Sequence, residues 1–165
     1  MARKTDETDG GWLQFGTPNT FSAAALLGET DFKAVVVMPA YRLNVFGFLY
    51  SSELEQDAAS AGESTGNHGF WDQRLALEWT KENIHLFGGN GRNITISGYS
   101  AGTTPSSRYI DHTDKKTGGH SVFQQLAYDL RLPDSDSIIS RACIWSNGPG
   151  VQPKSPADAQ KQFTQ

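Results

Sequence analysis

Asn93-Ile94-Thr95-Ile96-Ser97-Gly98-Tyr99-Ser100-Ala101-Gly102 is the stretch of sequence that decides the fold. Its first five residues are rich in β-branched side chains, which favours a buried strand. The Gly-X-Ser-X-Gly pattern that follows is typical of a nucleophile elbow, a sharp strand-to-helix turn that exposes the serine hydroxyl. Ser100 is therefore the candidate nucleophile. A glycine- and serine-rich turn without catalytic function also fits these five residues when they are taken alone.

The chain before this stretch predicts a strand and then a helix. Residues 34–38 form a continuous apolar run, the pattern of a strand buried on both faces of a parallel sheet. Between residues 70 and 87, Leu75 and Trp79 fall on one helical face, which we expect to be the buried face. The glycines at 88 and 89 are suited to a left-handed cap at the end of this helix.

The chain after this stretch predicts a second helix and a second strand. Apolar residues between 122 and 130 have helical spacing and are followed by Pro133, while residues 142–146 are predicted to form a buried strand. Cys143 lies in that strand, where we expect a small buried hydrophobic residue, and as the sole cysteine it has no intrachain disulfide partner. Alternating strands and helices predict an α/β fold with a mostly parallel central sheet flanked by helices.

Composition narrows the classes of partner. The 165 residues carry a net charge of −4 and no basic cluster beyond the lysines at 115 and 116, which argues against binding to nucleic acid. No apolar run is long enough to span a membrane. The first nine residues lack the hydrophobic segment of a secretory signal, and the sequence does not indicate in which cellular compartment the protein works. The acidic residues between 53 and 63 are not accompanied by a histidine and do not have the regular spacing of metal ligands. We therefore expect no metal and no cofactor.

Several blocks of the sequence resemble the type-B carboxylesterases, the family that also holds the cholinesterases and several lipases. The blocks are residues 10–12, 41–49, 66–73 and 87–102, and the resemblance extends over most of the chain from Gly10 to Gly150 apart from residues 103–119. The resemblance implies an α/β-hydrolase fold. It also implies hydrolysis of a small-molecule carboxylic ester through an acyl-enzyme on Ser100.

The same resemblance implies an oxyanion hole. Its donors would be the backbone N–H of Ala101 and the loop at Gly10 and Gly11, which is similar to the Gly-Gly of the family's His-Gly-Gly loop. Asp9 stands where that loop has its histidine. A carboxylate turned toward the developing oxyanion would raise the barrier to reaction.

The resemblance also divides the chain. Residues 10–102 run from the oxyanion loop to the nucleophile elbow, and residues 120–150 supply the next helix and strand. Residues 103–119 are polar, aperiodic and interrupted by proline, so we interpret them as an insertion. The insertion separates two blocks that fit one helix, and untranslated sequence retained in a gene model is one explanation for it.

The rest of the catalytic triad is expected after residue 165, because family members are a few times longer and their acid and histidine follow the serine much later. On this reading residues 1–165 are an incomplete α/β-hydrolase domain. The histidines present are expected to be solvated or locally hydrogen-bonded; they are His68, His85, His112 and His120. The alternative to an active esterase is a catalytically incomplete, truncated relative that acts as a non-enzymatic or unstable module.

Two further sequence features, an aspartate and a possible glycosylation sequence, could be taken for functional sites but also fit a purely structural role. Asp72 precedes the serine, on the wrong side for the triad acid of this fold. We therefore expect a buried structural carboxylate or an acid at the N-terminus of a helix, paired with Arg74 or Arg42. Asn93-Ile94-Thr95 fits a glycosylation sequon. It enters a strand expected to be buried, so we expect no glycan there unless Asn93 is exposed.

Overall fold

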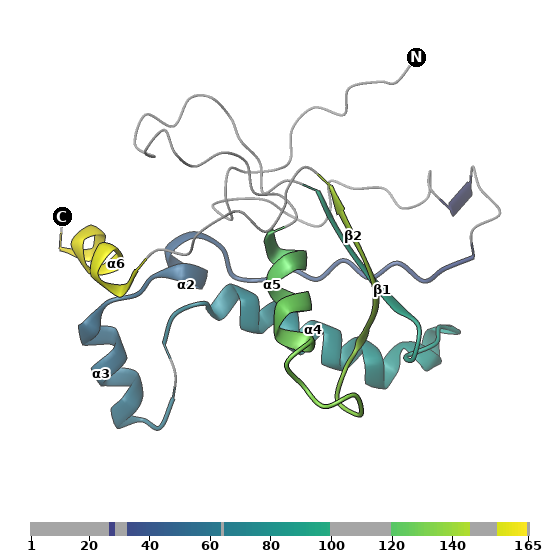
Figure 1. The fold of residues 1–165 in the computed structure, drawn as a ribbon, viewed down its shortest axis with the longest axis horizontal. Coiled ribbons are helices and arrows are strands. Elements are labelled where there is room, and N and C mark those ends of the chain that lie inside the picture. The colour runs from purple at the N-terminus through teal and green to yellow at the C-terminus, as the bar shows by residue number, and fades with distance from the viewer. Residues whose placement is uncertain (1–26, 29–32, 64, 100–119, 146–154, 165) are drawn as a thin grey trace, which may run out of the picture.

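The fold was analysed in a computed structural model of the chain, which describes residues 27–28, 33–63, 65–99, 120–145 and 155–164. Within these residues the structure contains helices and a small parallel sheet (Figure 1). The sheet comprises the strands β1 (Ile94–Tyr99) and β2 (Ile139–Trp145), and helix α5 (His120–Asp129) connects them in the chain. This strand-helix-strand unit has the parallel crossover of an α/β protein.

The other elements precede or follow this unit. They are the helices α2 (Asn44–Phe48), α3 (Ser52–Ser60), α4 (His68–Asn83) and α6 (Pro156–Phe163), and the 3₁₀ helix η3 (Ile84–Phe87). In Figure 1, α4 crosses the molecule below the strands, and α3 and α6 lie at the end away from them. Among the described helices, none is both long and apolar enough to cross a membrane.

Side-chain alternation gives the sheet one covered face and one open face. Helix α5 packs against both strands. Ile94 is buried and Ile96 half-buried, whereas Thr95 and Ser97 on β1 are exposed, as is Cys143 on β2. The expectation of a buried Cys143 is therefore wrong, because it is paired in register with Ser97 on the open face.

The strand expected at residues 34–38 is not formed. Residues 33–43 are assigned neither helix nor strand, and the side chains of Val35 and Val37 are 42% and 41% exposed. An apolar run becomes a strand only where a neighbour completes its backbone hydrogen bonds, and the described sheet pairs β1 with β2 alone.

Helix α4 has the expected position but buries a different face. Gly88 adopts a left-handed conformation with φ of 78° at the end of η3, so the predicted glycine cap is confirmed. The predicted buried face is wrong, because Leu75 is 65% exposed and Trp79 is 49% exposed. The side that faces the protein carries Gln73 and Arg74, since α5 meets α4 through polar groups together with an aromatic contact between Trp71 and Tyr128.

Gly69 allows the start of α4 to approach the chain before it. A Cβ atom at this position would collide with the carbonyl oxygen of Arg42 and with the ring of Phe48. Phe48 also packs edge to face against Phe70, with ring centroids 5.0 Å apart. The missing side chain therefore sets the distance between α2 and α4.

We expect Gly69→Ala to destabilise the protein. Helix propensity alone would raise the free energy of unfolding by up to about 1 kcal/mol, but the collision is expected to reverse the sign and lower it by about 1–3 kcal/mol. Urea denaturation measures the difference, with Gln56→Ala on the exposed helix α3 as a control for propensity. A Gly69→Ala protein more stable than the wild type would contradict the close approach.

Candidate functional site

The four residues predicted to form the site are Ser100, Ala101, Gly10 and Gly11. All of them lie outside the described residues, as does the predicted insertion at 103–119. Their roles stay predictions. The structure describes the strand that leads into the nucleophile, and it confirms the predicted strand, which runs from Ile94 to Tyr99 and ends directly before Ser100.

Register places the end of β1 at the carboxyl edge of the sheet. Tyr99 is paired in parallel with Trp145, so the last residues of both strands lie side by side. In open α/β sheets, ligands bind outside the carboxyl ends of the strands. The chain therefore enters residue 100 at the edge where an α/β protein places its reactive groups.

The amino ends of the strands are fixed by an irregular pairing. Ile94 is paired with Ile139, but Thr95 is paired with Arg141, so Ser140 is an extra residue on β2. The Ser140 hydroxyl donates a hydrogen bond of 3.0 Å to the carbonyl oxygen of Arg92, just before β1. This contact holds the irregularity at one place and so fixes the register of the residues that follow it.

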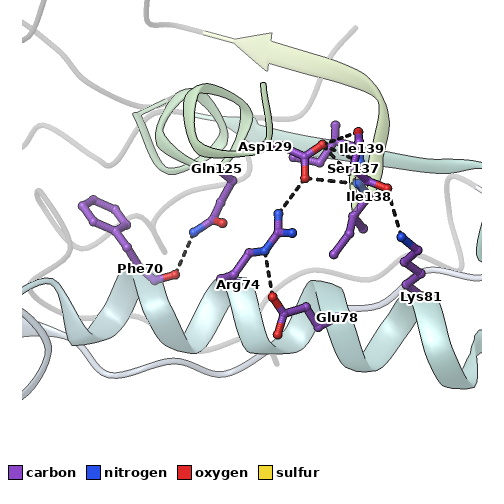
Figure 2. A network of polar contacts seen from close by, with 9 residues as sticks. All are labelled: Phe70, Arg74, Glu78, Lys81, Gln125, Asp129, Ser137, Ile138 and Ile139. Atoms are coloured by element: carbon purple, nitrogen blue, oxygen red, sulfur yellow. Dashed lines mark hydrogen bonds and ion pairs between the residues drawn. The ribbon is translucent and has the colours of Figure 1, made fainter. Parts of the chain in front are cut away.

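A buried carboxylate, Asp129 at the end of α5, organises the approach to β2 (Figure 2). Its side chain is 3% exposed and forms an ion pair of 2.6 Å with Arg74 of α4, which is 6% exposed. It also accepts a hydrogen bond of 2.7 Å from the Ser137 hydroxyl. The backbone N–H groups of Ile138 and Ile139 donate to it at 3.0–3.1 Å. One carboxylate thus joins two helices to the first residue of β2.

Neighbouring contacts strengthen the same junction. Lys81 donates to the carbonyl oxygen of Ser137 at 3.0 Å, and Gln125 donates to the carbonyl oxygen of Phe70 at 2.7 Å (Figure 2). Arg74 makes a second ion pair of 3.0 Å with Glu78, and its guanidinium carbon lies 5.1 Å from the centre of the Tyr128 ring. This network was not predicted from the sequence. The sequence carries only a weak signal for it, because each helix contributes polar residues but no regular spacing relates the residues of one helix to those of the other.

The environment of Asp129 favours its charged form. Burial by itself raises the pKa of this carboxyl, but the hydrogen bonds from Arg74, Ser137, Ile139 and Ile138 outweigh burial and lower the pKa to about 2, from 3.8. A carboxyl whose pKa is lower in the folded state stabilises the fold above its unfolded pKa, and this stabilisation is lost as pH falls toward the folded value.

We expect Asp129→Asn to destabilise the protein at pH 7 by about 3–5 kcal/mol, because Arg74 loses its buried partner. The wild type should lose about 2 kcal/mol of stability from this carboxyl as pH falls from 3.8 to about 2. The variant should lack this part of the pH dependence. Urea unfolding at several pH values measures both effects, with Asp134→Asn as an exposed control for the lost charge. Equal losses in the two variants would contradict the assignment.

Asp72 has the structural role expected from the sequence. Of the two partners considered, it pairs with Arg42: the guanidinium donates to both carboxylate oxygens at 2.8 Å, and the Arg42 backbone N–H adds a bond of 2.9 Å. The hydrogen bonds from Arg42 lower the pKa of Asp72. Arg74, the other partner considered, binds Asp129 and Glu78 instead.

The side chains of two histidines are described, and two hollows lie near the amino ends of the strands. His68 is half-buried at the start of α4, and His85 is exposed on η3, which leads into the amino end of β1. His112 and the side chain of His120 lie outside the described residues. Two shallow hollows, one beside Arg74 and one beside Arg92, flank the loop before β2. Both therefore border the amino ends of the strands.

The parallel strand-helix-strand unit, with β1 leading into a Gly-X-Ser-X-Gly sequence, places this chain in the α/β class. The model of the carboxylesterase family matches residues 9–119, a range that includes Gly10, Gly11, Ser100 and Ala101. The chain belongs to the carboxylesterase family, as its sequence blocks indicated.

Individual proteins similar to this chain are named as esterases. A carboxylic ester hydrolase of Gibberella moniliformis is 52% identical over 156 residues, which cover 93% of this chain and 26% of that protein. An uncharacterized esterase/lipase of Schizosaccharomyces pombe is 40% identical over 161 residues, which cover 94% of this chain and 26% of that protein. An acetylcholinesterase of Danio rerio is 42% identical over 84 residues, 51% of this chain and 12% of that protein. The chain thus spans about a quarter of the length of the first two relatives.

Proposed function

We propose that this chain supplies the nucleophile and the oxyanion donors of a carboxylic ester hydrolase with an α/β-hydrolase fold. The observation that supports the proposal is the end of β1 at Tyr99. This end lies at the carboxyl edge of a parallel pair, and Ser100 is the next residue in the sequence of a chain that belongs to the carboxylesterase family. The substrate class is a small-molecule carboxylic ester.

The proposed reaction begins with attack of the Ser100 hydroxyl oxygen on the ester carbonyl carbon. A general base takes the serine proton, and the carbonyl oxygen becomes a tetrahedral oxyanion. Backbone N–H groups at Ala101 and at the loop of Gly10 and Gly11 would stabilise that charge, which is greater in the transition state than in the bound ester.

Collapse of the tetrahedral intermediate breaks the bond to the alcohol oxygen, and the alcohol leaves with a proton from the same base. Water then attacks the acyl-enzyme and releases the carboxylic acid and free Ser100. The described residues Asp72 and Asp129 are not assigned the role of triad acid, because each is held by an arginine in a structural ion pair.

A fluorophosphonate probe tests the nucleophile, because it reacts with activated serines. We expect labelling at Ser100 when the chain is tested together with the base that is expected after residue 165, and Ser100→Ala should then lower both labelling and ester hydrolysis by at least about 10³-fold. Ser97→Ala is the matched control: this serine is exposed on the same strand, three residues earlier, and its removal should leave labelling intact.

Two results would contradict the proposal. Labelling that persists in Ser100→Ala would show that another residue reacts with the probe. A wild-type chain that unfolds cooperatively in urea but is not labelled would instead support the catalytically incomplete relative.

A further inference from the structure

The sequence contains one Asn-X-Ser/Thr triplet, Asn93-Ile94-Thr95, and the proposed esterase reaction gives it no role. Such a triplet is the acceptor sequence for N-linked glycosylation, provided that the middle residue is not proline. A glycan is bulky and solvated, so the folded chain can carry one only where the asparagine side chain reaches solvent.

The structure exposes both residues of the acceptor sequence. Asn93 is exposed and ends the turn before β1, where its backbone N–H donates to the carbonyl oxygen of Asn90 at 2.9 Å. Thr95 is exposed on the open face of β1. Ile94 between them is buried, because successive side chains of a strand point to opposite faces. The burial expected for the strand therefore applies to Ile94 and not to its neighbours.

The contacts of Asn93 leave the reactive nitrogen accessible. A guanidinium N–H of Arg141 donates a hydrogen bond to Oδ1 of Asn93. A guanidinium group can only donate, so the amide oxygen must face Arg141 and the amide nitrogen Nδ2 points elsewhere. Within the described part of the chain, no hydrogen bond engages Nδ2. Among the described residues, the atom that would carry the sugar is thus free of hydrogen-bond partners.

We propose that Asn93 is an N-glycosylation site of this chain. The donor is an oligosaccharide linked through a diphosphate to a polyprenyl lipid. Nδ2 forms a bond to the anomeric carbon of the first sugar, the bond from that carbon to the phosphate oxygen breaks, and the lipid diphosphate leaves with the electron pair. One Nδ2 proton passes to a base of the transferase. The glycosylated amide keeps its oxygen and one N–H, so the hydrogen bond from Arg141 is retained.

The chain is expressed behind a cleavable secretion leader in a eukaryotic secretory host and treated with peptide-N-glycosidase. We expect one downward mobility step on treatment, and mass spectrometry should find aspartate in place of asparagine at position 93, since this enzyme deamidates the acceptor. Asn93→Gln and Thr95→Ala should abolish the step. Thr95→Ser, which keeps the hydroxyl, and Asn90→Gln, three residues earlier in the same turn, should retain it.

A second acceptor sequence provides the control for access to the transferase. Ala58→Asn creates one on α3, a helix in which no residue is buried. The proposal is overturned if the Ala58→Asn chain gains a glycan at position 58 while Asn93 stays unmodified in the same molecules. It is equally overturned if the mobility step of the wild type persists in Asn93→Gln.

Discussion

The carboxylate of Asp129 is the group on which the described fold depends. A charge that is 97% buried would be costly alone, and it is tolerated because Arg74 and three further donors surround it. These donors come from α4 and from the loop that becomes β2. The carboxylate therefore fixes the end of α5, the face of α4 and the first residue of β2 relative to one another.

This junction reaches the proposed nucleophile through the sheet. Asp129 holds Ile139, Ile139 is paired with Ile94, and Ile94 begins the strand that ends before Ser100. The irregular pairing at Ser140 sets the register once, near the amino ends, so the carboxyl ends at Tyr99 and Trp145 come into line. A structural ion pair at the amino edge of the sheet thus positions β1, the strand that precedes the proposed nucleophile in the sequence.

The helices and strands could be predicted from the sequence more accurately than the side-chain contacts between them. Local patterns were sufficient for β1, α5, β2 and the cap at Gly88, because β-branched runs, helical spacing and glycine act over a few residues. Local patterns failed to predict that Leu75 is exposed and that residues 34–38 do not form a buried strand, because burial depends on what packs against a segment. The Arg74–Asp129 pair joins residues 55 positions apart, which no local pattern encodes. The site residues were predicted from the serine pattern and family resemblance alone.

A double-mutant cycle on Arg74→Met and Asp129→Asn tests the central role of this pair most directly, with the free energy of unfolding at pH 7 as the readout. We predict that the two changes are strongly non-additive, with a coupling energy of about 1–3 kcal/mol. A parallel cycle on Arg42→Met and Asp72→Asn should give less than about 1 kcal/mol, because Arg42 is 52% exposed. Additive effects at Arg74 and Asp129, within about 0.5 kcal/mol, would contradict the account.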